Sequence, residues 1–140
     1  MTAVRNSKQQ RKSTLLRKIL IEYCLTFAGA YEDYPFDDST TAMRHGGNRR
    51  IFALFLNHDG RELLNLKSEP FTALFWRNEF SSVIPGYHMN KVHWNSVILD
   101  GTVPDEVIKE MIAESHELTK PKIRKRKIPQ DLDKDRDNAW

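Results

Sequence analysis

The 140-residue sequence has a single cysteine and no apolar run of the roughly 18 residues that a membrane-spanning helix needs. One cysteine excludes an internal disulfide, and the apolar face of an expected helix makes Cys24 a small buried hydrophobe rather than a nucleophile. Residues 1–12 are polar and basic and lack the apolar segment of a secretory signal. We therefore expect a cytoplasmic protein that folds around an apolar core.

Signatures of catalysis are missing as well. No glycine-rich phosphate loop occurs, and no candidate nucleophile stands in a Gly-x-Ser-x-Gly elbow. These candidates are Ser81, Ser82, Ser96 and Cys24. The histidines His88 and His93 are five positions apart, a spacing that places both rings on one face of neither a helix nor a strand. The sequence thus predicts no enzymatic activity, no metal site and no cofactor.

Positive charge is concentrated at the two ends of the chain. Residues 1–18 hold six Lys or Arg and no acid, whereas residues 19–120 hold nine basic and fifteen acidic residues. Residues 121–140 hold seven basic and four acidic residues. The net charge of +3 therefore hides an acidic body, which opposes nucleic-acid binding unless its acids lie on another face.

The first predicted helix carries apolar residues at three- and four-residue spacings from Leu15 to Phe27. Gly29 is its stop signal, and Ser7 or Ser13 can cap its start. The opposite, polar face of this helix holds Arg17, Lys18 and Glu22. Residues 1–12 have no apolar periodicity, and we expect them to be disordered and basic.

Two further helices are expected. Ser68 can cap a short helix with an inner face made of Phe71, Leu74 and Phe75. Thr102 and Asp105 resemble a capping box for a last helix that ends near Lys120. Its apolar face is formed by Val107, Ile108, Met111, Ile112, Ser115 and Leu118. We expect residues 121–140 to form a charged, disordered tail.

Strand signals fill the interval between the first helix and the last. The clearest strand, Ile51–Leu56, is nearly all apolar and is expected at the centre of a sheet, and His58-Asp59-Gly60 after it is a hairpin signal. The other expected extended segments are Ala30–Phe36, Ala42–Asn48, Glu62–Lys67 and Trp94–Leu99. This order predicts one α+β domain over residues 13–120, with helices packed on an antiparallel sheet in two layers.

The stretch from Val83 to Asp100 is the strongest candidate for a recognition surface, because aromatic, amide, imidazole and amine side chains crowd into it. Aromatic rings can stack on bases, amides can read adenine, and Lys or protonated His can meet phosphate. We predict a nucleic-acid contact formed by Tyr87, His88, Asn90, Lys91, His93 and Trp94, with help from Arg49, Arg50 and the basic ends. A structural reading is the alternative: Tyr87 and Trp94 would pack against the sheet, and Asn90 and Asn95 would bond loop backbone.

Several strings in the sequence resemble the MmcQ/YjbR family. They are Tyr31-Glu-Asp-Tyr-Pro-Phe36, Leu64-Asn-Leu-Lys67 with Glu69-Pro70, Ile84-Pro-Gly-Tyr-His-Met-Asn-Lys-Val-His-Trp-Asn-Ser-Val97, and Asp100-Gly-Thr-Val-Pro-Asp105. The likeness covers about residues 14–119. Ser68 and His116 stand where family members often carry Cys and Tyr, and the basic tail after Lys120 lies outside the resemblance.

The resemblance implies a CyaY-like α+β domain and a "double-wing" DNA-binding role without an assigned enzymatic activity. We therefore expect DNA as the partner of a monomeric protein. One alternative is a protein-interaction module that binds a peptide or subunit through a strand edge or helix face. A weaker one, by analogy of fold alone, is iron delivery through Glu32, Asp33, Asp37 and Asp38.

Overall fold

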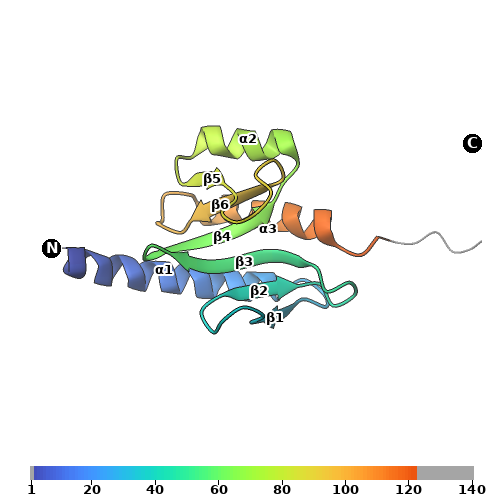
Figure 1. The fold of residues 1–140 in the computed structure, drawn as a ribbon, viewed down its shortest axis with the longest axis horizontal. Coiled ribbons are helices and arrows are strands. Elements are labelled where there is room, and N and C mark those ends of the chain that lie inside the picture. The colour runs from blue at the N-terminus through green and yellow to red at the C-terminus, as the bar shows by residue number, and fades with distance from the viewer. Residues whose placement is uncertain (1, 123–140) are drawn as a thin grey trace, which may run out of the picture.

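The computed structural model describes residues 2–122, with side chains from Lys8 onward, as three helices and six strands (Figure 1). In chain order they are α1 (Thr2–Cys24), β1 (Tyr31–Asp33), β2 (Thr41–Arg44), β3 (Ile51–His58), β4 (Arg61–Lys67), α2 (Pro70–Glu79), β5 (Val83–Pro85), β6 (Trp94–Ile98) and α3 (Asp105–Thr119). The strands form one sheet in the order β1-β2-β3-β4-β6-β5, and every neighbouring pair is antiparallel. The predicted α+β class is confirmed, and β3 is central as expected.

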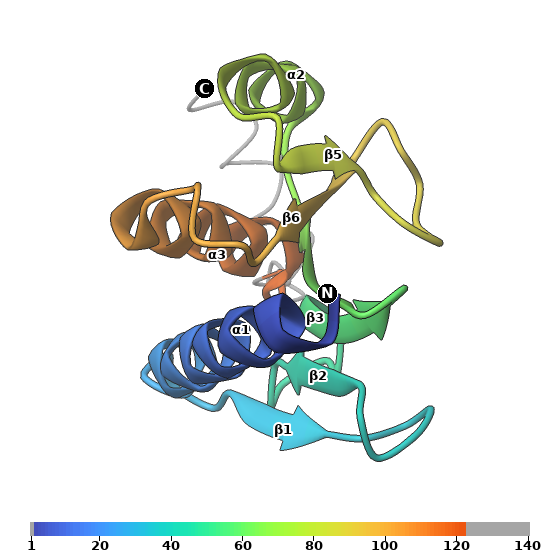
Figure 2. The same cartoon turned by 90° about the vertical axis from the view of Figure 1, so that its left-hand side faces the viewer.

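Helices cover one face of this sheet. Figure 2 shows α1 and α3 side by side on that face, with α2 at the β5 edge. Side chains alternate across a strand, so Leu64 and Leu66 of β4 enter the core below the helices while Asn65 points to the other face. On that other face Asn65 donates a hydrogen bond to the Tyr87 carbonyl of the β5–β6 loop. The sheet therefore has a helical side and a side that carries this loop.

The start of α1 differs from the sequence-based expectation. The helix begins at Thr2, so the prediction of disorder for residues 1–12 is wrong; the predicted tail lies outside the described residues from position 123 onward. Gln, Arg and Lys at positions 8–12 are good helix formers, and they extend a helix that packing has already anchored. Ser13 is no cap. It is buried in the helix, and its hydroxyl donates to the Leu99 carbonyl at 2.7 Å.

The inward face of α2 was also predicted wrongly. Phe71, Leu74 and Phe75 are 89%, 51% and 55% exposed, while Ala73 is fully buried and Trp76 packs against the core. The sequence offers two apolar stripes at helical spacing, and spacing alone does not choose between them. The stripe that contains Ala73 faces the sheet, where the Asn95 amide of β6 donates to the Ala73 carbonyl at 3.1 Å.

Neither expected helix cap forms. Ser68 is buried and its backbone N–H donates to the His93 carbonyl, and Glu69 occupies the N-cap position of α2 without a side-chain bond. The Thr102 hydroxyl bonds Asp100 and Ser82, and Pro104 is the N-cap of α3. The Thr102 hydroxyl is thus used by Ser82 and Asp100, and the Ser68 backbone by the β5–β6 loop. A local capping pattern reveals neither contact. Strand β5 was not predicted either, because three residues ending in proline carry little strand signal.

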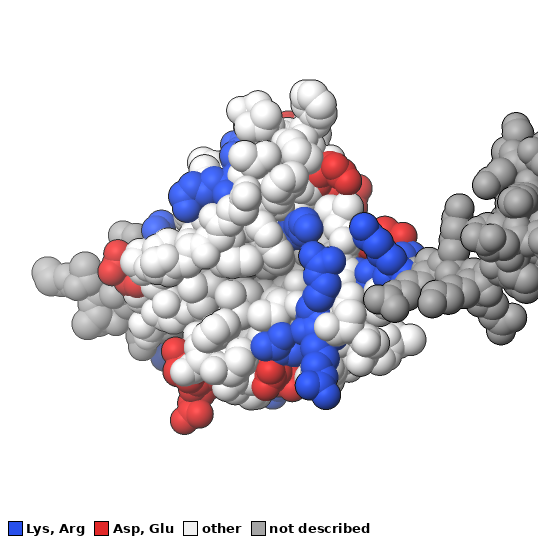
Figure 3. All heavy atoms as spheres, turned by 45° about the vertical axis from the view of Figure 1, so that its right-hand side comes forward, with Lys and Arg blue, Asp and Glu red and all other residues white. Residues whose placement is uncertain are grey.

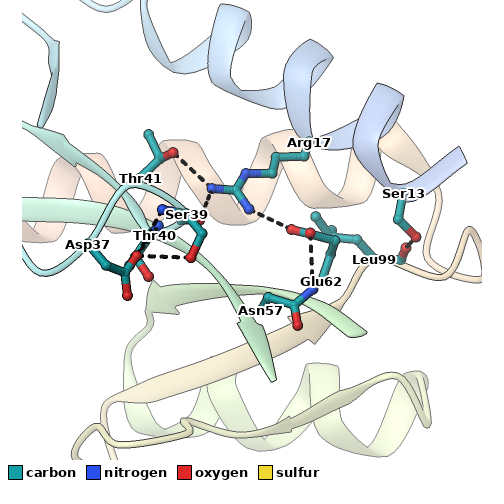
Figure 4. A network of polar contacts seen from close by, with 9 residues as sticks. All are labelled: Ser13, Arg17, Asp37, Ser39, Thr40, Thr41, Asn57, Glu62 and Leu99. Carbon is teal, nitrogen blue, oxygen red and sulfur yellow. Dashed lines mark hydrogen bonds and ion pairs between the residues drawn. The ribbon is translucent and has the colours of Figure 1, made fainter. Parts of the chain in front are cut away.

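Arg17 ties α1 to the sheet, although the sequence placed it on the exposed face of the helix. Figure 4 shows its guanidinium between the β1–β2 connection and β4. It donates to Glu62 Oε2 at 2.7 Å, to the Ser39 carbonyl at 2.6 Å and to Thr41 Oγ1 at 2.9 Å. The Arg17 and Glu62 side chains are only 15% and 16% exposed. Such a pair is little screened by solvent, so loss of one partner leaves the other charge partly buried and alone.

We expect Arg17→Met to destabilise the protein by about 2–4 kcal/mol, because it keeps the aliphatic stem but removes the partners of Glu62, Ser39 and Thr41. Lys18→Met is the matched control, since Lys18 is the next residue on the helix and is exposed. Urea unfolding followed by circular dichroism measures both. Equal stability of the two variants would show that the Arg17 contacts contribute nothing.

Candidate nucleic-acid interface

The loop between β5 and β6, residues 86–93, is closed by backbone bonds at its base. Gly86 N–H donates to the Trp94 carbonyl at 2.8 Å, and Trp94 N–H donates to the Asn90 carbonyl at 2.9 Å. The chains approach so closely that a Cβ on Gly86 would lie 2.8 Å from Trp94 Cβ and 2.9 Å from its carbonyl oxygen. Glycine is therefore required at this position, which explains the Pro-Gly pair seen in the sequence.

Two of the predicted contact residues make bonds inside the loop. Asn90 Oδ1 accepts from the backbone N–H of Val92 at 2.9 Å and of His93 at 3.3 Å, and Lys91 Nζ donates to the Gly86 carbonyl at 2.9 Å. These bonds are what the structural reading expected of Asn90. They leave the amide oxygen of Asn90 engaged, whereas Lys91 remains an exposed cation.

The aromatic residues of the loop divide into half-buried and exposed ones. Tyr87 is half-buried: its ring stacks on His58 at 4.1 Å between centroids and contacts His88 at the same distance. Its N–H donates to Ser96 Oγ, so the loop is fastened to the sheet. Trp94 is half-buried as well. His88, in a left-handed conformation with φ of 58°, and His93 are the exposed rings.

Arg77 of α2 also holds the loop, a role the sequence did not reveal. Its Nε donates to Asn95 Oδ1 at 2.6 Å, and its Nη2 donates to the carbonyls of Lys91 and Trp94. One guanidinium thus fixes the C-terminal half of the loop, from Lys91 to the start of β6. The only sequence signal of this role is an arginine near the end of a predicted helix, and that signal is weak.

Arg49 and Arg50 lie on the β2–β3 turn and are exposed. The turn is anchored to the end of α3: Asn48 Nδ2 donates to the Thr119 carbonyl at 3.0 Å, and His45 Nε2 lies 2.8 Å from Thr119 Oγ1. His45 is 4% exposed, and its backbone N–H donates to the Arg50 carbonyl. The backbone that carries both arginines is therefore anchored at a buried histidine.

The His45 ring packs against His116 and Phe52, with centroids at 4.4 Å and 5.0 Å, and His116 stacks on Phe27 at 4.2 Å. Burial, with the nearby His116 and Arg50, lowers the pKa of His45 to about 4, and burial also lowers the pKa of His116. Both imidazoles are therefore neutral at pH 7, and the cluster behaves as a small aromatic core.

Strand register brings the base of the loop and the β2–β3 turn to the same end of the sheet, whereas Tyr87 of the loop reaches back along the sheet to stack on His58, next to Asp59. Lys67, at the end of β4, is paired with Trp94, at the start of β6, and β3 begins at that end with Ile51. Figure 3 shows Lys and Arg side chains in a band across this part of the surface. We use the term basic stripe for four residues of this region, Arg44, Arg49, Arg50 and Lys67. Arg44 and Lys67 were not predicted, because a lone basic residue in a strand has no motif.

Acidic residues gather at the opposite end of the sheet. Asp59 lies at the β3–β4 turn, Asp100 follows β6, and Asp105 and Glu106 begin α3. Near the stripe, Asp33 is ion-paired with Arg44 at 2.7 Å and Glu117 with Lys120 at 2.7 Å. Glu69 and Glu114 also lie at this end, beside Lys67. The first half of α1 borders the acidic end, since Gln9, Asp59 and Asp100 line one hollow. The basic residues of positions 8–12 are therefore remote from the stripe.

The described residues hold no cluster of three or more His, Cys, Asp or Glu suited to a metal ion. Asp33 is ion-paired with Arg44, Asp37 Oδ1 accepts from Ser39 and Thr40, and Glu32 Oε2 accepts from the Tyr34 hydroxyl, so three of the four acids considered for iron have other partners. Burial raises the pKa of the Cys24 thiol to about 12, as expected for a buried hydrophobe. Among the helices of residues 2–122, none has the length and apolarity to cross a bilayer.

The geometry defines a class of protein: a small α+β domain with helices on one sheet face and a basic end beside a fastened polar loop. Residues 25–118 match the YjbR family, and the chain belongs to that family. The uncharacterized protein YyaQ of Bacillus subtilis is 31% identical over 118 residues, covering 76% of this chain and 99% of the relative. The uncharacterized protein YjbR of Escherichia coli K12 is 32% identical over 98 residues, covering 70% and 81%.

Solved structures show the same fold. A Deinococcus radiodurans protein described by the domain name DUF419 superposes with a TM-score of 0.64 at 33% identity, covering 83% of each chain. A solution structure from Pseudomonas syringae gives a TM-score of 0.67 at 25% identity, covering 80% of this chain and 98% of that one. The predicted family and fold are therefore confirmed.

We expect stability to fall as the pH drops from about 6.5 towards 4. The folded-state pKa of His45 is below its ordinary value near 6.5, so the unfolded chain binds more protons in that window, and the stabilisation present above it is lost. His45→Gln should lower the slope of unfolding free energy against pH by about 1 kcal/mol per pH unit. Urea unfolding from pH 5 to 8 measures it, with His88→Gln, at an exposed site, as the control. If His45→Gln kept the wild-type slope of unfolding free energy against pH, the assignment of this pH dependence to His45 would be wrong.

Proposed function

We propose that this chain is a non-enzymatic nucleic-acid-binding protein, with DNA as its partner, acting as a monomer in the cytoplasm. The observation that carries the proposal is the separation of charge along the sheet. The net acidity of the body argued against binding, but Asp59, Asp100, Asp105 and Glu106 lie at the end opposite the basic stripe. A phosphate backbone can therefore approach the stripe without meeting those acids.

Individual side chains have separable roles in this proposal. The exposed Arg49 and Arg50 contact phosphates, and Lys67 and Lys91 add charge on either side of the β6 start. His88 and His93 are the exposed rings available to a base or sugar. Tyr87, Asn90 and Trp94 act mainly by holding the loop in shape, as their stacking and hydrogen bonds support. Pro121, after α3, lies against Gly47 of the β2–β3 turn. The basic residues that follow it in the sequence, up to Lys127, add non-specific attraction.

The exposed apolar face of α2 favours a second candidate function, the binding of a protein segment. Phe71, Leu74 and Phe75 share that face, and exposed patches of this kind mark protein contacts in many monomers. This contact is separate from the basic stripe, so the two functions are compatible.

We expect the double variant Arg49→Ala/Arg50→Ala to bind a short labelled DNA duplex about tenfold or more weakly at low salt. It removes two phosphate contacts, so the slope of log affinity against log salt should fall by about 2. Fluorescence anisotropy across a salt series of about 50 to 200 mM measures both quantities.

The matched control is Lys18→Ala/Arg61→Ala, which removes the same charge from two exposed residues remote from the stripe. It should retain most of the affinity and the wild-type salt slope. If the two double variants lost equal affinity for the duplex, binding would depend on net charge alone and not on the stripe. If the wild-type protein bound no duplex, the proposal would be wrong.

A further inference from the structure

The exposed face of α2 is an apolar feature of the described surface. Phe71, Leu74 and Phe75 stand at positions i, i+3 and i+4, so their side chains are neighbours on one face of the helix. Their exposed fractions of 89%, 51% and 55% leave on the order of 300 Å² of apolar area in contact with solvent. A patch of that size marks a place where another segment binds.

Acidic residues border this face. Glu69 and Glu79 are exposed at the two ends of α2, while Arg77, its one basic residue, is turned inward to the Asn95 amide and the β5–β6 loop. Figure 3 shows the top of the molecule, where Figure 1 places α2, as mostly uncharged, with acidic side chains on one flank and basic side chains on the other. The face is thus complementary to a segment that is apolar and basic.

We propose that this face is the docking site of the chain's own C-terminal segment, residues 123–140, with Trp140 as the main anchor. The segment contains four large apolar residues, Ile123, Ile128, Leu132 and Trp140. It holds six basic residues, four of them at positions 124–127, which suit the acidic border, and four Asp at positions 131–137, so its net charge is +2. Tryptophan is among the side chains that contribute most to the binding energy of protein contacts, so we take Trp140 as the main anchor.

The segment starts close enough to reach α2. The start of α2 touches α3, since Glu69 N–H donates to Glu114 Oε2 at 3.3 Å and the preceding Lys67 N–H donates to Ser115 Oγ at 2.9 Å. Helix α3 ends at Thr119, little more than one turn beyond these contacts. An extended chain of the length of residues 123–140 spans up to about 60 Å, so a large part of it is available to cover the face.

The segment lies outside the region that matches the YjbR family, which ends at residue 118. Docking is therefore an addition that this chain makes to the family fold. It does not depend on nucleic-acid binding, because the basic stripe and the α2 face use different residues.

The test compares amide NMR spectra of the full chain and of a chain ending at Lys122, without nucleic acid. Removal of residues 123–140 should shift the amides of Phe71–Glu79, beyond the immediate neighbours of Lys122, and Trp140→Ser in the full chain should reproduce most of those shifts. In a Phe71→Ser/Phe75→Ser background, truncation should leave the amides of α2 unchanged. Leu15→Ser, at another exposed apolar residue, should leave the truncation shifts intact.

Amides of α2 that do not respond to truncation overturn the proposal. Shifts that grow with protein concentration, with a matching rise in mass by light scattering, overturn it in favour of a second copy of the chain on this face. Shifts that are independent of concentration and abolished by Phe71→Ser/Phe75→Ser support docking within one chain.

Discussion

Coverage of one face of the sheet by helices is the constraint on which the rest of this structure depends. Helices α1 and α3 both pack on that face, so β4 alternates Leu64 and Leu66 towards the core with Asn65 towards the other side. The uncovered side is then free to receive the β5–β6 loop. Because α3 runs along the sheet from Asp105 to Thr119, its acidic first turn and its end beside the β2–β3 turn lie at opposite ends. The charge separation follows from this arrangement.

Polar side chains fix the helices on the sheet at few, well-defined points. Ser13 bonds the Leu99 carbonyl, Arg17 bonds Glu62, and His45 bonds Thr119, each across many residues of sequence. A buried polar group is costly without its partner, so each such contact selects one position of a helix along the sheet. Apolar burial supplies the driving force, and these bonds make the packing unique.

Sequence reasoning recovered the features that have a local physical signal. The apolar run Ile51–Leu56 and the Asp59-Gly60 turn predicted the central hairpin, whose turn residues adopt φ of 52° and 74°. The inner face of α3 was also correct, with Ile108, Met111 and Ile112 buried. These elements follow from periodicity and turn chemistry alone.

Features that depend on partners distant in sequence were missed. The spacing of Phe71, Leu74 and Phe75 is as regular as that of the buried stripe of α2, and only the contact with Asn95 decides between them. Arg17 and Ser68 looked like surface and cap residues because their partners, on β4 and the β5–β6 loop, are distant in sequence. In the candidate interface the loop residues were found from composition. Arg44, Lys67 and Arg77 required the register of the strands and the packing of α2.

The close approach of Gly47 to Pro121 has a practical consequence for attaching the protein to a surface or probe. A Cβ on Gly47 would lie 2.7 Å from Pro121 Cγ, so the chain that leaves α3 runs against the β2–β3 turn. The start of α1 lies at the other end of the molecule (Figure 1). A linker or fluorophore joined at the N-terminal end therefore leaves Arg49 and Arg50 facing solvent, whereas one joined after α3 crowds them.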